Sequence, residues 1–210
     1  IYVANTTSTS ADISLTAFDL TGAQVWQRTI DSSADEVFTA ATIDGQGNVW
    51  LAGSAALLKP AETMTPIIGI DNPDNVITES TTALRNDMNQ LALWKINSLG
   101  ELTATYLSPQ NFIPIATSIS ATNSGISVVG TMNARPFFIS ATTIGVFGKL
   151  VAIGSAKSEF NTVVRHSDGT SSIFGSSAET IAGQKTSGIR DGILIRVSKT
   201  GAITKLVRSY

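Results

Sequence analysis

The sequence predicts an all-β fold of repeated antiparallel sheets, and three observations carry this prediction. Short runs of β-branched and aromatic residues alternate with glycine-rich turns, which is the pattern of strands joined in hairpins. Two kinds of hairpin recur along the 210 residues. One complete unit, from Gly130 to Gly175, is 45 residues long, which is typical of a four-stranded blade. Together these observations predict a β-propeller.

The first kind of hairpin is clearest at residues 38–54. Phe38, Ala40 and Thr42 alternate with other residues, as on one face of a strand. Asp44-Gly45-Gln46-Gly47-Asn48 supplies residues that accept positive φ in a turn, and Val49-Trp50-Leu51 follows as a second strand. Without gaps, this stretch superposes on two later ones and on the end of a fourth copy, at residues 115–130, 160–175 and 2–5. The gapless superposition aligns Phe38 with Ile115 and Phe160.

The second kind of hairpin is anchored on Gly22, Gly100 and Gly201, with a looser copy around Gly145. The distance from this glycine to the glycine that ends a first hairpin is nearly constant. It is 31 residues from Gly22 to Gly53 and 30 residues from Gly100 to Gly130. Such a constant period predicts that the two hairpins alternate in one repeating unit.

We therefore expect residues 1–210 to form one propeller domain of about four blades. The first blade (residues 1–30) lacks its opening strand, so it is either part of a larger propeller or one blade of a compact ring that obtains this strand elsewhere. Association through this incomplete blade is one expected consequence. A long insertion, residues 55–90, interrupts the second blade, and a shorter polar insertion, residues 179–190, interrupts the fourth. Loops of this length are usually functional or irregular.

Composition limits the classes of function. Charged residues make up 14% of the chain and the net charge is −2, which argues against a nucleic-acid partner because such a surface needs clustered Lys and Arg. Ser and Thr together number 50, as is common in secreted β-proteins, and cysteine is absent. The best candidate for a membrane span, residues 137–156, contains Lys149 and fits the repeat, so no span is expected.

Two stretches resemble a known group of repeats. The stretch Asp44-x-x-Gly47-Asn48-Val49-Trp50-Leu51-x-Gly53 and the stretch from Asp191 to Ile203 are similar to bacterial β-propeller repeats of the SBBP/NHL-like or regulator-propeller-like kind. The resemblance covers most of the chain outside residues 55–90. Asn5 departs from it by replacing the closing glycine, and residues 121–125 depart from it by lacking the Asp-x-x-Gly turn. It implies the propeller fold and an extracellular or cell-envelope location, but no single activity.

Candidate catalytic and metal sites are weak. His166, the single histidine, lies between Arg165 and Ser167-Asp168-Gly169, where turn chemistry explains the aspartate better than a catalytic triad does. Zinc lacks ligands, whereas calcium could use the oxygen atoms of Asp71, Asn72, Asp74 and Asn75. No Gly-rich phosphate loop opens a helix. We assign no catalytic, metal or cofactor-binding residue.

Carboxylates and tryptophans remain as possible parts of a carbohydrate site. A glycosidase needs a pair of carboxylates, and the candidates mostly fall at strand ends and turns: Asp12, Asp19, Asp35, Glu36, Asp44 and Asp191. Trp50 and Trp94 are expected to pack between blades rather than to stack on a sugar.

Three functions stay open. The first is a non-enzymatic secreted or cell-surface propeller that binds a protein or carbohydrate partner. The second is a glycan hydrolase or lyase domain, and the third is an architectural module of a larger surface assembly.

Overall fold

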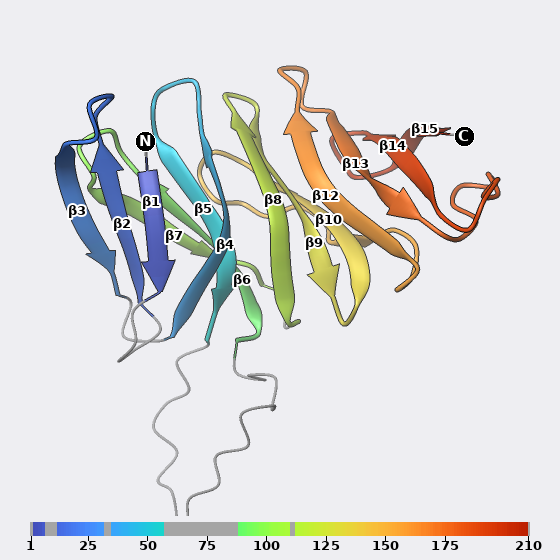
Figure 1. Cartoon of the computed structure of the whole chain (residues 1–210), viewed down its shortest axis with the longest axis horizontal. Coiled ribbons are helices and arrows are strands. Elements are labelled where there is room, and N and C mark those ends of the chain that lie inside the picture. Colours follow the sequence, from blue (N-terminus) through green and yellow to red (C-terminus); the bar gives the residue numbers. More distant parts are fainter. Residues whose placement is uncertain (1, 7–11, 32–34, 57–87, 110–111, 210) are drawn as a thin grey trace, which may run out of the picture.

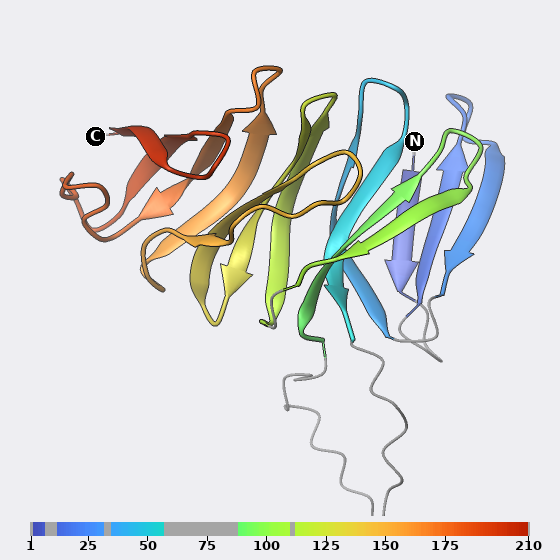
Figure 2. The same ribbon diagram turned by 180° about the vertical axis from the view of Figure 1, so that it is seen from behind.

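Four antiparallel sheets stand side by side and fan out from one end of the molecule to the other (Figure 1). The computed structural model of the chain describes residues 2–6, 12–31, 35–56, 88–109 and 112–209. These residues form strands and turns and contain no helix, so none of them forms a helix that could cross a membrane. The two ends of the described chain lie at opposite ends of the row of sheets (Figures 1 and 2).

The strands follow one another in each sheet in the order of the sequence. The first sheet has three strands, β1 (Tyr2–Thr6), β2 (Ile13–Phe18) and β3 (Gln24–Ile30). The second has four, β4 (Glu36–Ile43), β5 (Val49–Ala55), β6 (Gln90–Ile96) and β7 (Leu102–Leu107). The predicted insertion therefore joins β5 to β6, and its residues 57–87, with the proposed calcium ligands, lie outside the described residues.

The third and fourth sheets repeat this plan. The third contains β8 (Pro114–Thr122), β9 (Gly125–Met132), β10 (Arg135–Ala141) and the short β11 (Val151–Ala152). The fourth contains β12 (Ser158–Arg165), β13 (Ser171–Ser177), β14 (Asp191–Val197) and β15 (Ile203–Arg208). Three four-stranded antiparallel sheets of this order confirm the predicted all-β blade architecture.

One five-residue turn occurs six times in the described part of the chain. The N–H group of its first residue donates to the carbonyl of its fifth, and its fourth residue is a glycine with φ between +78° and +86°. In five of the six turns a side-chain oxygen of the first residue also accepts backbone N–H groups: Asp19, Asp44, Asn97, Thr142 and Ser198. A glycine is needed because other residues rarely adopt this φ. This geometry explains the glycine anchors found in the sequence.

The first hairpin of each complete sheet bends at a β-bulge. The bulges lie between Phe38 and Ala40, between Ala116 and Ser118, and between Phe160 and Thr162. A glycine stands opposite each one, and a Cβ atom on Gly53 would lie 2.0 Å from the carbonyl oxygen of Val37. The closing glycine of the repeat is therefore required by the close approach of two strands.

The gapless superposition of the first hairpins is wrong by one residue in the third sheet. Gly53 pairs with Phe38, but Gly130 pairs with Ala116 rather than with the predicted Ile115. The reason is the turn from Thr122 to Gly125, which is one residue shorter than its counterpart in the second sheet. A slip of one residue moves a side chain to the other face. Accordingly Ile115 is half exposed and Ala116 is buried.

The first sheet corresponds to strands two to four of the others. The bulge between Ala17 and Phe18 of β2 has counterparts between Lys95 and Ile96 of β6 and between Arg196 and Val197 of β14. Hence β2 is equivalent to β6 and β14, and β1 is equivalent to a second strand. Within the described residues no strand pairs with the far edge of β1.

The core lies between the sheets rather than inside them. Three clusters of buried side chains fill the three spaces between neighbouring sheets. The first strands β4, β8 and β12 lie next to one another along one edge of the row. Between β8 and β12, the hydroxyls of Ser118 and Ser120 accept hydrogen bonds from the backbone N–H groups of Val163 and Arg165. Neighbouring sheets are thus joined by apolar packing and by these polar contacts.

Candidate functional site

Three turns meet at one end of the first strands and line a small open hollow. They join the first and second strands of the last three sheets, at the upper end of the molecule in Figure 1. We call the space between them the axial hollow. It has a volume of about 260 Å³ and is lined by Gly45, Ala121, Thr122, Asn123, Ser124 and Ser167. Its exposed surface is more apolar than polar, with a few hydroxyl and amide groups and no charged side chain, so it suits a neutral ligand.

Asp44 holds the first of these turns and connects it to the core. One carboxylate oxygen accepts the N–H groups of Gln46 and Asn48, at 2.9 and 3.0 Å, and the other accepts the indole N–H of Trp50 at 2.9 Å. Burial works to raise the pKa of Asp44, but the hydrogen bonds from Asn48 and Trp50 outweigh it, so this pKa lies below its ordinary value of 3.8. Asp44 is therefore a structural carboxylate.

Arg165, a residue of β12, connects the fourth sheet to the second of these turns through Ser124 of the hollow's lining. It is buried, and its guanidinium donates to the hydroxyl and carbonyl oxygens of Ser124, to the carbonyl of Ile126 and to the hydroxyl of Ser127. Burial lowers the pKa of Arg165. Sequence reasoning did not assign Arg165 a role. Its position two residues after buried Val163 was the available signal, because alternate residues of a strand share one face.

The predicted turn chemistry of His166 and Asp168 agrees with the structure. The carboxylate of Asp168 accepts the N–H and hydroxyl groups of Thr170, and it forms an ion pair with Arg196 at 3.6 Å. The hydrogen bond with the Thr170 hydroxyl is the main reason why the pKa of Asp168 is lowered. His166 Nε2 instead lies 2.8 Å from the hydroxyl of Ser172. Since the carboxylate is engaged elsewhere, this Ser–His pair lacks the orienting acid of a triad.

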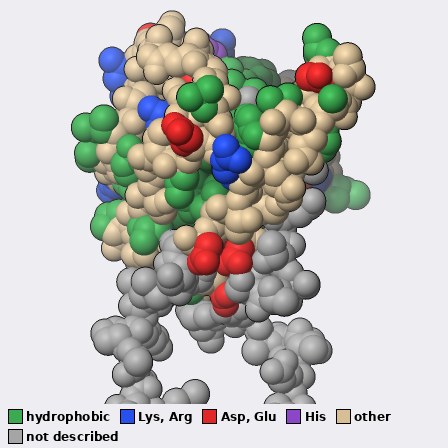
Figure 3. All heavy atoms as spheres, turned by 90° about the vertical axis from the view of Figure 1, so that its left-hand side faces the viewer, with side chains coloured by type: hydrophobic (Ala, Val, Ile, Leu, Met, Phe, Trp, Pro, Cys, Tyr) green, Lys and Arg blue, Asp and Glu red, His purple; other side chains and the backbone are tan. Residues whose placement is uncertain are grey.

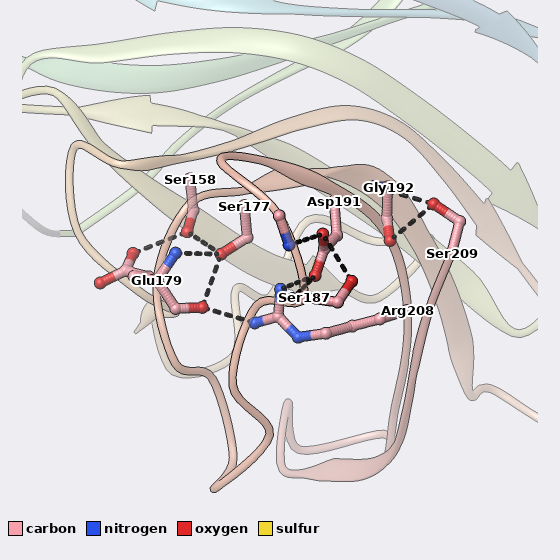
Figure 4. Close-up of polar contacts among 9 residues, drawn as sticks. Ser158, Ser177, Glu179, Ser187, Asp191, Gly192, Arg208 and Ser209 are labelled. Carbon is pink, nitrogen blue, oxygen red and sulfur yellow. Dashed lines mark hydrogen bonds and ion pairs between the residues drawn. The ribbon is translucent and has the colours of Figure 1, made fainter.

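A second polar cluster fastens the connection between β13 and β14 to the fourth sheet (Figure 4). Glu179 accepts hydrogen bonds from the hydroxyl of Ser158 and the N–H of Ser155, both at 2.6 Å. Asp191 accepts the N–H groups of Ser187 and Gly188 and pairs with Arg208 at 3.4 Å. The Asp191–Arg208 pair is almost completely buried. The predicted polar insertion at residues 179–190 is thus held closely on its sheet.

Both carboxylates of this cluster are kept ionised. The pKa of Asp191 is lowered, first by the hydrogen bond from the Ser187 backbone and also by Arg208. For Glu179, burial acts to raise the pKa, and the hydrogen bonds from Ser158 and Ser155 outweigh it. A general acid needs the opposite displacement. The cluster therefore has a structural role, which is to hold the β13–β14 connection on the fourth sheet.

The remaining sequence candidates also have structural positions. Asp19 caps a turn, and its hydrogen bond with the Thr21 hydroxyl is the main reason for its lowered pKa. Glu36 is completely buried at the start of β4. Trp50 and Trp94 are buried between sheets, as predicted, and Trp50 stacks on Tyr106 with ring centroids 6.2 Å apart. In the described part of the chain, no three His, Cys, Asp or Glu side chains converge as a metal site would require.

Comparison with known proteins identifies the fold. No family model and no curated sequence matches the chain. A solved structure of the Dos1 propeller aligns with all of this chain at 8% identity and a TM-score of 0.50. The fold is that of β-propeller blades. A luciferin-regenerating enzyme aligns with 94% of the chain at 10% identity and a TM-score of 0.44. This chain spans 45% and 56% of these two neighbours, respectively.

Proposed function

We propose that the chain is a non-enzymatic binding propeller, secreted or displayed at the cell surface, that binds a neutral polar ligand in the axial hollow. Such a ligand is the hydroxyl-rich surface of a carbohydrate or the main chain of a protein segment. The observation that carries this proposal is the lining itself, in which Asn123 and Ser167 are exposed at the hollow while Ser124 is held in place by Arg165. A preformed site with fixed polar groups suits recognition.

The lowered pKa values of several carboxyl groups support binding over hydrolysis. The pKa is displaced downward for Asp19, Asp44, Asp168, Glu179 and Asp191. A glycosidase needs one carboxylic acid whose pKa is raised and a second carboxylate facing it across the ligand. The low charge and the abundance of Ser and Thr support an extracellular location.

The proposal is tested by blocking the hollow without disturbing the core. Asn123→Trp and Ser167→Trp place a large ring at exposed positions of the lining. Leu20→Trp is the matched control, because Leu20 is 98% exposed in the β2–β3 turn at the same end of the molecule. The three variants and the parent protein are applied to a glycan array and to a peptide library, and soluble products are analysed in parallel.

We expect both hollow variants to weaken binding of the selected glycan or peptide by about tenfold or more. A tenfold loss of affinity corresponds to about 1.4 kcal/mol of binding free energy. The control should bind like the parent protein, and no ligand should be cleaved. Equal binding by all four proteins would place the site elsewhere. Release of product would make the chain an enzyme and overturn the proposal.

A further inference from the structure

The outer face of the fourth sheet carries a partly exposed apolar row, with the exposed Arg196 and Lys205 beside it. Along β14, Ile193, Ile195 and Val197 are buried against the third sheet, so Leu194 points to the opposite side. Leu194 pairs with Phe174 on β13 and with Val207 on β15. These three side chains form one row across the sheet, which we call the outer row. Phe174 and Val207 are 43% and 42% exposed.

The equivalent rows of the two preceding sheets are covered. In the second sheet the row is Ala52, Leu93 and Tyr106, and it packs against the third sheet. In the third sheet the row is Val129, Phe138 and Val151, and it packs against the fourth. Leu93 and Phe138 are at most 1% exposed. The outer row therefore has the same strand positions and the same apolar character as the rows that form two interfaces between sheets in this molecule.

A hollow beside the outer row fits a side chain from a covering sheet. Gly192 occupies the position that Leu91 has in the second sheet and Pro136 has in the third, as its pairing with Ser176 shows. A hollow of about 370 Å³ lies beside Gly192, Phe174, Leu194 and Val207, and Ser209 fills the space directly over Gly192. Close packing would require the covering surface to fill this hollow.

At the opposite end of the row of sheets, two described side chains of β2 that face outward are polar. Ser14 and Thr16 of β2 point away from the core, at the positions where β6 has buried Ala92 and Trp94. The amide of Gln27 donates to the hydroxyl of Ser14 at 3.2 Å. Figure 3 shows this end as a mixed surface with both signs of charge and scattered hydrophobic groups. A second copy docking head to tail would place this polar surface on the outer row. Its polar groups would then be taken out of water without gaining hydrogen-bond partners, which costs free energy.

We propose that the outer face of the fourth sheet binds a further four-stranded blade from a partner, packed as the third sheet packs on the second. Its facing side is aliphatic and aromatic, like the side that the third sheet presents through Ile126, Val128, Phe137 and Ile139. The contact buries the outer row and fills the hollow beside it. This inference is independent of the ligand of the axial hollow.

The experiment uses the whole chain with a probe blade attached. A second copy of residues 108–157, which contains the third sheet, is appended after Tyr210. Because the chain has no cysteine, Val207→Cys provides a single thiol on the outer row. Thr16→Cys provides the matched control thiol on the outward side of β2. The rate of thiol modification is measured for each cysteine with and without the appended blade.

The appended blade should slow modification of the thiol at position 207 by about tenfold or more, because reactivity follows exposure. Modification at position 16 should not change. Equal rates at position 207 with and without the blade would overturn the proposal. This holds whether circular dichroism shows added β-structure or unfolded appended residues, because the proposed contact with the outer row is expected to fold the appended blade.

Two further measurements separate the possible occupants. Leu194→Ser should lower the melting temperature of the extended protein more than that of the chain without the probe blade, since Leu194 is only partly buried in the latter. Light scattering should find the chain alone to be monomeric. A dimer that Leu194→Ser dissociates would assign the face to a second copy and refute the proposed partner.

Discussion

Arg165 should contribute more to stability than any other charged side chain near the axial hollow. In Arg165→Met the buried carbonyl oxygen of Ile126 and the partly buried one of Ser124 lose a donor, at 3.3 and 2.6 Å in the native protein. A buried acceptor left unpaired costs about 1–3 kcal/mol, whereas water in the hollow replaces the donor to Ser124. Removing a buried charge returns part of this free energy. We expect a net loss of about 2 kcal/mol from the free energy of unfolding.

The assay is urea unfolding followed by tryptophan fluorescence, with Arg196→Met as the matched control. Arg196 has a 44% exposed side chain and pairs with Asp168 at 3.6 Å. An exposed ion pair contributes only about 0–1 kcal/mol, so this variant should unfold almost like the parent protein. If Arg165→Met were as stable as Arg196→Met, the guanidinium could not be the fastener between the β8–β9 turn and the fourth sheet.

Two other predictions concern pH and the recurring turn. Asp44, Asp168, Glu179 and Asp191 have a lower pKa in the folded than in the unfolded protein, so the stability they add is present above their ordinary values of 3.8 and 4.5 and is lost as the pH falls below them. Urea midpoints should therefore be lower at pH 3 than at pH 7, and a midpoint that rises on acidification would contradict the assigned hydrogen bonds. Gly100→Ala should destabilise more than Gly22→Ala. Both glycines have φ above +80°, but a Cβ atom on Gly100 would lie 2.6 Å from the Trp26 ring, whereas Gly22 has open space. Equal melting temperatures for these two variants would show that the Trp26 contact is absent in solution.

The local features of the fold could be predicted from the sequence because they depend on short-range chemistry. Glycine anchors such as Gly22, Gly100 and Gly201 mark a turn whose φ few other residues adopt, and period-two runs mark the strands between them. The packing of Trp50 and Trp94 between sheets was also predictable, since large aromatic side chains at alternate strand positions favour burial.

Register and site required the tertiary structure. The pairing of Gly130 with Ala116 depends on a turn that is one residue shorter, and a gapless comparison of sequences has no means of placing that deletion. The axial hollow is formed by residues 45, 121–124 and 167, which only the side-by-side packing of three sheets brings together. The buried setting of Arg165 likewise arises from contacts with residues about 40 positions earlier in the chain.

The sequence by itself determined the repeating hairpins, their turns and the all-β class, because each of these results from interactions within a few residues or across one hairpin. Only the tertiary structure decided which faces are buried between sheets and which remain open. Leu93 and Leu194 occupy equivalent strand positions and are the same residue type, yet one is completely buried and the other lies on the open outer row. The difference lies in whether a following sheet covers them, and that is a property of packing between distant segments rather than of local sequence.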